Sequence, residues 1–318
     1  MHPPLFLGID AGGTRTRALC ADSTGAVVGF GESGPANMSG PDRDSALRHL
    51  REAADAARGP IGPQAIEAVC VGAAGVLSMP GPAERFGARL RTALGVPGPV
   101  AFLGDAVTAF AAGTAEPDGA VLIAGTGAVA LEVRGHTEIA GRADGYGWLL
   151  GDAGSGFWLG REAVSAALRH LDGQGPGGRM VRAVLDAIAP ANRTSGGVIA
   201  RCMAEAPARL ARFAPTVCEA AEDGDGLARE IVARAIAHLA ATAEAVAERG
   251  RPLVLAGSLL AERTPVARGL DERLAERLAD TPVLTAAEPV RGAAWLAGRV
   301  FAPHEAARRE LHRRLTAA

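Results

Sequence analysis

Two glycine- and threonine-containing turns each follow an apolar stretch of the chain. They are Gly12, Gly13 and Thr14 in "GIDAGGTRT", and Gly125, Thr126 and Gly127 in "VLIAGTGA". Glycines can adopt positive φ and bare their main-chain amides, and the threonine hydroxyls add further donors, so such a turn can hold phosphate oxygens. Either turn alone is equally well explained as an ordinary hairpin connection. The occurrence of two such turns favours a polyphosphate-binding site in which one turn contacts the phosphates from each side.

Two aspartates lie where they could serve the same chemistry. Asp10 ends the apolar stretch before the first turn, where its carboxylate could hold hydrated Mg²⁺ against phosphates. Asp105, in "FLGDAVTAF", lies between a predicted strand and a predicted helix. It is a good helix N-cap, and it could also orient a hydroxyl and accept its proton. Because phosphoryl transfer depends mainly on positioning and charge stabilisation, a base of modest strength suffices.

Aromatic residues gather in the segment "DGYGWLLGDAGSGFWLGREAV", residues 144–164, which holds two of the three tryptophans and the only tyrosine. Aromatic faces beside glycine backbone and a carboxylate are typical of sugar sites, so Tyr146 and Asp152 are candidate sugar contacts. The helical spacing around Trp158 favours a packing role for that side chain instead. Asn37, in "SGPANMSG", is explained equally well by turn chemistry or by ligand binding.

The elements that must position these residues form a repeated pattern. Strands are predicted at 5–10, 15–21, 27–32, 65–71 and 100–103, and helices at 42–58 and 83–94. After a hinge-like "AAGTAEPDG", the stretch "AVLIAGTGAVALEV" again places a Gly-Thr turn between two predicted strands, which suggests two related halves. Residues 157–249 are predicted to be largely helical, and "RPLVLAGSLL" is predicted to be a buried strand that runs into Gly257 and Ser258.

Composition narrows the class of protein. The 318 residues are 48% hydrophobic with a formal net charge of -2, which predicts a globular protein of about two domains without a general attraction to nucleic acid. The four cysteines are scattered without C-x-x-C spacing, so metal binding by them is not indicated and a reducing compartment suits them: Cys20, Cys70, Cys202 and Cys218. No signal peptide or membrane span is visible, so we expect a soluble, cytoplasmic protein that does not bind membranes.

Together these motifs resemble the actin-like ATPase superfamily, which includes sugar kinases, hexokinase and the heat-shock ATPase domains. "GIDAGGTRT" resembles its first phosphate motif, "VLIAGTGA" its second and "VLAGSLL" its adenosine motif. "GWLLGDAGSGFWLGREAV" and "LGDAVTAFAAGT" are most similar to the N-acetylglucosamine kinase branch, which is grouped with activator ATPases of acyl-CoA reductases and dehydratases. The resemblance covers nearly the whole chain in the expected order.

The resemblance implies an α/β, two-domain, ribonuclease H-like fold with the active site in the cleft between domains that close on substrate. It places an N-terminal domain at 1–115, a C-terminal domain with a helical insertion at 116–290, and a helical tail at 291–318 that returns to the N-terminal domain. It also implies an ATP- and Mg²⁺-dependent kinase that acts on the 6-hydroxyl of N-acetylglucosamine, with glucosamine or another hexose as alternative substrates. Homodimer formation is implied as well.

The same resemblance assigns roles residue by residue. Asp105 matches the catalytic base and also contacts the sugar, and Asp10 matches the acid that holds Mg²⁺, through water. The nucleotide-binding positions are Gly12, Gly13, Thr14, Arg15, Gly125, Thr126, Gly127, Gly257 and Ser258. The sugar-binding positions are Asn37, Gly75, Gly145, Tyr146, Gly147 and Asp152.

Three departures from the branch pattern affect the sugar site. Tyr146 stands where the acetylglucosamine kinases often have Trp, Ala153 where they have Glu, and Val129 where some have a sugar-binding Asn. All three leave the phosphate motifs intact, so the kinase assignment is firmer than the choice of sugar.

Two readings of other classes are weaker. An ATPase that activates an electron-transfer enzyme would need cysteines near helix ends to hold a cluster between subunits, and the cysteines here lie in predicted strands or apolar helices. A sugar-sensing regulator would be expected to carry a helix-turn-helix segment, and none precedes residue 5.

Overall fold

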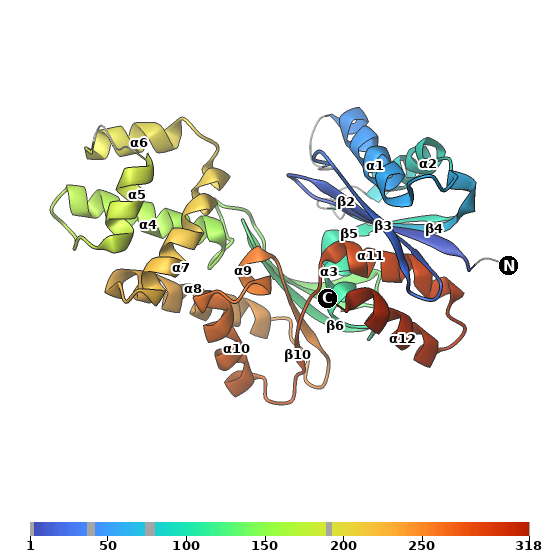
Figure 1. The fold of residues 1–318 in the computed structure, drawn as a ribbon. Helices are drawn as coiled ribbons and strands as arrows, with labels where there is room; N and C mark the ends of the chain where they lie inside the picture. Colours follow the sequence, from blue (N-terminus) through green and yellow to red (C-terminus); the bar gives the residue numbers. More distant parts are fainter. Residues whose placement is uncertain (1–2, 37–41, 74–79, 189–192, 318) are drawn as a thin grey trace. The chain divides into compact units, whose positions relative to one another are not determined.

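The computed structural model describes residues 3–36, 42–73, 80–188 and 193–317, and it contains two five-stranded sheets (Figure 1). The internal contacts divide the chain into two compact units. The first comprises Met1–Asp118, Val133–Ile139 and Ala286–Ala318, and the second comprises Gly119–Glu132 and Ala140–Thr285.

The first sheet has the strand order β3-β2-β1-β4-β5. Its strands are β1 (Leu5–Ala11), β2 (Thr16–Asp22), β3 (Val27–Ser33), β4 (Ile66–Ala73) and β5 (Val100–Gly104). The first three strands form an antiparallel meander, whereas β4 and β5 add in parallel to β1, each after a helix. The β-β-β-α-β-α-β order predicted from the sequence is confirmed.

Both faces of the first sheet are covered because its central strands are apolar on both sides. Along β1, Leu7 and Ile9 face one buried cluster, whereas Phe6 faces another, as the period of two requires. The first cluster is completed by α1 (Arg43–Arg58) and α2 (Pro80–Leu94); the second by α3 (Asp105–Gly113), α11 (Pro289–Gly298) and α12 (Glu305–Thr316).

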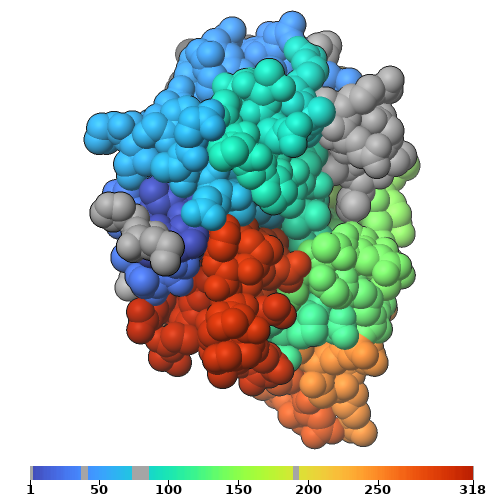
Figure 2. All heavy atoms as spheres, turned by 90° about the vertical axis from the view of Figure 1, so that its right-hand side faces the viewer, coloured from blue at the N-terminus to red at the C-terminus, as the bar shows by residue number. Residues whose placement is uncertain are grey.

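The C-terminal helices therefore belong to the first unit. Figure 2 shows the red C-terminal segment on the surface of this unit, next to blue and cyan N-terminal residues. Trp295 of α11 is buried and donates from its indole nitrogen to the Arg308 carbonyl of α12 at 3.0 Å, which joins the two helices.

The second sheet has the order β10-β9-β6-β7-β8. Its strands are β6 (Gly119–Ala124), β7 (Ala128–Arg134), β8 (Glu138–Asp144), β9 (Leu253–Ala256) and β10 (Val283–Thr285). Read in the other direction, β8-β7-β6-β9-β10, this order corresponds strand by strand to β3-β2-β1-β4-β5 of the first sheet. As β4 does in the first sheet, β9 lies parallel to the first strand, here β6, and β10 lies parallel to β9. The two related halves suggested by the repeated Gly-Thr turn are confirmed at the level of topology.

Helices between β8 and β10 share one apolar core with the second sheet. They are α4 (Gly156–Leu171), α5 (Arg179–Ile188), α6 (Ser195–Met203), α7 (Ala214–Glu222), α8 (Gly226–Glu244), α9 (Ser258–Ala261) and α10 (Pro265–Arg277). Short 3-10 turns lie at η1 (Pro63–Ala65), η3 (Pro207–Phe213) and η4 (Arg299–Phe301). Trp158 is buried in this core, as its helical spacing predicted. No helix of the described residues combines the length and apolarity needed to cross a bilayer.

A buried histidine lies at the β7–β8 turn, within the first unit. His136 is 3% exposed, and its ring contacts Trp295 edge to face at 4.8 Å between centroids. Arg299 donates to its Nδ1 at 2.9 Å. Burial, and next the charge of Arg299, lowers the pKa of His136 to about 3. The folded protein therefore holds this ring neutral.

This pKa predicts a loss of stability on mild acidification. The folded pKa lies below the ordinary value, so the contribution is complete above pH 6.5 and falls as the pH drops toward 3. Between pH 7 and pH 5 we expect the wild type to lose about 2 kcal/mol more than His136→Asn, since one pKa unit corresponds to about 1.4 kcal/mol. Asn tolerates the positive φ of 58° at this position.

Urea unfolding at the two pH values measures this difference, with exposed His170→Asn as the matched control. An equal loss in wild type and His136→Asn would show that His136 is not responsible.

Candidate functional site

Asp10 and Asp105 lie at the carboxyl ends of two parallel strands of the first sheet. Asp10 is on β1 and Asp105 directly follows β5. Carboxyl ends of parallel strands gather at one edge of a sheet, where open α/β sheets bind their ligands. The structure brings the two side chains close enough for the charge of Asp105 to raise the pKa of Asp10.

Asp10 has a strongly shifted acidity. Burial, and then the charge of Asp105, raises its pKa to about 6, and Arg17 opposes this shift. Arg17 is the cross-strand partner of Asp10 on β2, and Glu288, at the start of α11, fixes its guanidinium through an ion pair of 2.6 Å. Besides burial, the charges of Asp105 and Glu288 raise the pKa of Asp10, and those of Arg17 and Arg15 lower it. Because the pKa stays raised, a cation in front of Asp10 would be favourable.

Asp105 is the first residue of α3, and Gly104 is the N-cap, so the prediction that Asp105 caps this helix was wrong. Its carboxylate accepts from the Ala106 amide at 2.9 Å, which ties the side chain to the first turn of the helix. Burial raises its pKa, and hydrogen bonds from the amides of Ala106 and of Asp105 itself partly oppose this. A carboxylate with a raised pKa is a stronger base than a solvated one and suits proton acceptance from a hydroxyl.

The β1–β2 turn presents open backbone. Gly12 donates to the Arg15 carbonyl at 3.0 Å and closes the turn, while Gly13 and Thr14 are exposed. Within the described part of the chain, the amides of Gly13 and Thr14 meet no acceptor. The side chain of Arg15 is also exposed, 3.6 Å from the carboxylate of Glu32.

The positive φ that Gly12 and Gly13 could adopt is not observed, so that part of the interpretation was wrong. A Cβ at Gly12 would meet the Arg15 carbonyl oxygen at 2.8 Å, and one at Gly13 would meet nothing within 4 Å. Gly12 is therefore needed for the tight turn itself, whereas at Gly13 neither conformation nor a neighbour in the described chain requires glycine. The close approach of a ligand would require it.

The β6–β7 turn directs its carbonyls backwards. Those of Gly125 and Thr126 accept from the first amides of α4, Gly156 at 2.8 Å and Phe157 at 3.0 Å. Gly125 donates to the Gly127 carbonyl at 2.9 Å. The amides of Thr126 and Gly127 have no acceptor among the described residues. They form a pair of main-chain donors that is suited to an anion.

The strand β9 ends in a second constrained glycine. Gly257 has φ of 89°, and a Cβ there would meet the Ala124 carbonyl oxygen at 2.3 Å, so it is fixed as glycine by both conformation and packing. It turns the chain so that Ser258 starts α9 beside Gly125, where a Cβ on Gly125 would lie 3.6 Å from Ser258 Oγ.

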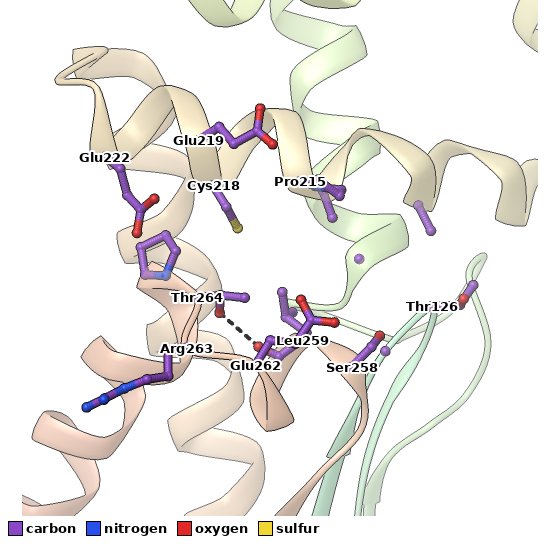
Figure 3. A pocket seen from close by; sticks show the side chains of 15 residues that line it. Thr126, Pro215, Cys218, Glu219, Glu222, Ser258, Leu259, Glu262, Arg263 and Thr264 are labelled. Carbon is purple, nitrogen blue, oxygen red and sulfur yellow. Dashed lines mark hydrogen bonds between the residues drawn. The ribbon is translucent and has the colours of Figure 1, made fainter.

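A cavity of about 430 Å³ opens in the second unit, next to the β6–β7 turn and the start of α9 (Figure 3). Its volume is within the usual range of small-molecule sites, roughly 300–1,000 Å³. Thr126 and Ser258 line one end, and Cys218 of α7 points its sulfur into the space from the opposite wall. The remaining lining residues come from the β6–β7 turn, α4, η3, α7 and the segment from α9 to α10: Gly125, Gly156, Ala211, Ala214, Pro215, Glu219, Glu222, Leu259, Glu262, Arg263, Thr264 and Pro265.

The loop after β8 is held by a residue that the motifs did not single out. The Asp144 carboxylate accepts from the amides of Asp152 at 2.7 Å and Ala153 at 2.9 Å, which closes the loop. Gly145 and Gly147 have φ of 71° and 83°, which explains the glycines on both sides of Tyr146. The position of Asp144 directly before the glycine-rich run was the only sequence signal for this role.

Tyr146 and Asp152 emerge from this loop differently. Tyr146 is 61% exposed, under the Arg142 guanidinium at 5.4 Å from the ring centroid. Asp152 is half-buried beside the β6–β7 turn, since a Cβ on Gly127 would meet its Oδ2 at 2.9 Å. Burial raises the pKa of Asp152, amides of Ala128 and Gly147 oppose this, and the charge of Asp144 adds to it.

The other predicted sugar positions are placed only in part. Val129 packs against the loop, since a Cβ on Gly145 would meet its Cγ2 at 2.6 Å. Asn37 and Gly75 lie outside the described residues.

The donor set at Asp10 fits a hydrated Mg²⁺. Within residues 3–36, 42–73, 80–188 and 193–317, no three His, Cys, Asp or Glu side chains are grouped to hold a metal ion. Mg²⁺ commonly uses one or two carboxylates, several waters and substrate phosphates, so Asp10 with Asp105 nearby is a sufficient set.

Comparisons with known proteins decide the family. The model of the BadF/BadG/BcrA/BcrD ATPase family matches residues 7–297. The chain belongs to this family. The structure also superposes on that of a candidate N-acetylglucosamine kinase from Chromobacterium violaceum with a TM-score of 0.71, at 24% identity, covering 92% of this chain and 99% of that one, which establishes the shared fold.

Curated proteins with similar sequences are named as kinases. An N-acetylmuramic acid/N-acetylglucosamine kinase of Clostridium acetobutylicum is 30% identical over 53% of this chain and 55% of that protein, so the match spans about half of each. An N-acetyl-D-glucosamine kinase of Dictyostelium discoideum is 24% identical over 93% of this chain and 98% of that protein. The BadF/BadG/BcrA/BcrD family model covers both predicted phosphate turns and both aspartates.

Proposed function

We propose that the protein is an ATP-dependent sugar kinase that transfers the γ-phosphoryl group to the 6-hydroxyl of N-acetylglucosamine. The observation that carries this proposal is the pairing of Asp105, a half-buried carboxylate of raised pKa at the start of α3, with Asp10 at the same sheet edge. A sugar kinase needs a base that takes the proton of the sugar hydroxyl, and Asp105 can supply it. The names of the similar proteins support the same class.

Each group has a role in this proposal. Asp105 orients the acceptor hydroxyl and takes its proton as the new bond to phosphorus forms. The free amides of Gly13 and Thr14 and those of Thr126 and Gly127 bind phosphate oxygens. The cavity lined by Ser258 takes the adenosine. Mg²⁺, with Asp10 as its carboxylate, would neutralise charge on the phosphates.

The sugar assignment rests on the loop after β8. Its rigid backbone presents an exposed aromatic ring at Tyr146 and a carboxylate at Asp152, which are the groups that stack on a pyranose and hydrogen-bond its hydroxyls. Asn37 and Gly75 are proposed as further contacts from the family resemblance. Val129 and Ala153 replace polar residues of the branch, so glucosamine and other hexoses stay alternatives.

A sugar panel tests the proposal. ADP release is measured with ATP, Mg²⁺ and N-acetylglucosamine, glucosamine, N-acetylmuramic acid or glucose, and the product is analysed by NMR for phosphorus at C6. We expect N-acetylglucosamine to give the highest kcat/KM. Hydrolysis of ATP that no sugar stimulates would contradict the kinase assignment.

Tyr146→Ala is expected to raise the KM for the sugar about tenfold and leave the KM for ATP unchanged. The exposed ring would supply stacking worth about 1 kcal/mol or more, which the alanine lacks. Tyr146→Trp, which restores the residue common in the branch, should keep the low KM. An unchanged sugar KM in Tyr146→Ala would remove this residue from the sugar site.

The assembly and location follow the resemblance. We propose a homodimer in a reducing cytoplasm, where the four thiols, which are free in the structure, would remain reduced. Sedimentation velocity of the full chain tests the dimer, and a monomer at micromolar concentration would reject it.

A further inference from the structure

The helix that carries Asp105 is packed unusually close to the strand beside it. Thr108, one turn after Asp105, is completely buried. A Cβ added to Gly72 of β4 would lie only 2.2 Å from Thr108 Oγ1 and 2.6 Å from its Cγ2. Gly72 does not have positive φ, so the backbone conformation does not require glycine there. The contact with Thr108 does.

Helix α11 makes the same kind of contact with α3. A Cβ added to Gly292 of α11 would lie 2.1 Å from the Thr108 carbonyl oxygen and 2.5 Å from the Ala112 nitrogen. These are backbone atoms, which cannot move without moving the helix. Thr108 is therefore in close contact with both β4 and the C-terminal helix α11, and α3 has no room to move toward either of them.

The contacts at Thr108 continue to the carboxylate. The Thr108 hydroxyl donates to the Asp105 carbonyl at 2.9 Å, and the Asp105 carboxylate accepts from the Ala106 amide at 2.9 Å. The side chain of Asp105 is thus fixed to the first turn of α3, and the first turn is fixed through Thr108. A displacement of the helix would carry the carboxylate with it.

We propose that Gly72, Thr108 and Gly292 are positioning residues that set the place of the Asp105 carboxylate for phosphoryl transfer. The inference rests on the proposed kinase function. Misplacing a reacting group by about 1 Å can cost about a hundredfold in rate, so a packing contact of this closeness affects turnover more than ligand affinity. The C-terminal segment, which carries Gly292, thereby contributes to the N-terminal half of the site.

The test adds one methyl group and then removes the two atoms that it would approach most closely. Gly72→Ala is expected to lower kcat about tenfold or more while the KM for ATP stays within about twofold, because only the position of the base changes. In Gly72→Ala with Thr108→Ala, the two nearest atoms, Oγ1 and Cγ2, are gone, and only the Thr108 Cβ at 2.9 Å remains. The kcat of the double variant should therefore rise again, toward that of Thr108→Ala alone. Gly87→Ala, in α2 with nothing within 4 Å of the new Cβ, is the matched control and should behave as wild type.

A second readout does not depend on activity. Crystal structures of Gly72→Ala and of the double variant are compared with wild type, and we expect the Asp105 carboxylate to be displaced in the single variant and restored in the double. A carboxylate that stays in place in Gly72→Ala, or a kcat that the second substitution does not restore, would overturn the inference. A wild-type protein that phosphorylates no sugar would overturn the proposed function, whereas the displacement of Asp105 in the crystal structures would still test the contact between Gly72 and Thr108.

If Gly72→Ala does not fold, two variants of Thr108 decide. Thr108→Val keeps the volume but removes the hydroxyl that holds the Asp105 carbonyl, and we expect kcat to fall about threefold or more at unchanged KM. Thr108→Ser keeps the hydroxyl and should retain kcat. Equal kcat values for Val and Ser would overturn the inference.

Discussion

Asp105→Asn should lower kcat for sugar phosphorylation by about a thousandfold, within the range that general-base catalysis contributes. The amide has nearly the size of the carboxylate, and its oxygen can still accept from the Ala106 amide, so α3 should keep its start. What is lost is the ability to accept a proton from the sugar hydroxyl, and with it the negative charge that orients this hydroxyl.

Nucleotide binding separates this outcome from misfolding. The cavity proposed for adenosine is lined by residues of the second unit, so the dissociation constant of ATP should change by less than about threefold in Asp105→Asn. Asp55→Asn serves as the control, since the carboxylate of Asp55 pairs with the neighbouring Arg51 and Arg58 on α1, away from the candidate site. Wild-type turnover in Asp105→Asn would show that the residue is only a helix start.

Local patterns were sufficient for the order of strands and helices along the first half of the chain and for both glycine turns. The apolar runs of β1 and β4, and the repeated pattern of strand, Gly-Thr turn and strand, are properties of a few neighbouring residues. The structure contains both, in two sheets of equal strand order. The pairing of Asp10 with Asp105 could also be predicted, because parallel strands bring their carboxyl ends to one edge.

The rest depends on contacts between distant residues. The wall of the cavity formed by Pro215 and Cys218 carries no motif; only the fold brings α7 opposite Ser258. The need for glycine at position 72 is set by Thr108 on another element, and nothing in the local sequence shows it. Likewise, Gly12 and Gly13 were interpreted through φ, whereas the structure attributes Gly12 to a tight turn. A glycine in the sequence indicates that the backbone is constrained, but it does not show whether conformation, a tight turn or a packing contact is the reason.

Ser258→Trp should weaken ATP binding about a hundredfold or more, equivalent to about 2.7 kcal/mol. Ser258 is exposed at the start of α9, and its side chain lines the cavity between Thr126 and Leu259 (Figure 3). An indole there would occupy much of the space of about 430 Å³ and would compete with the nucleoside for it. Because the serine side chain faces the cavity rather than the core, the fold should tolerate the larger ring.

Calorimetric titration with ATP, in the absence of sugar, isolates this effect from catalysis. Ser258→Ala should bind ATP within about fivefold of wild type, because it leaves the cavity open and removes at most one hydrogen bond. Met203→Trp adds an equally large ring to an 83% exposed position on α6 of the same unit and should not change ATP affinity. Near-wild-type binding by Ser258→Trp would place the nucleotide elsewhere, and since the anion-binding amides of Thr126 and Gly127 adjoin the same cavity, their assignment to the phosphates would fall with it.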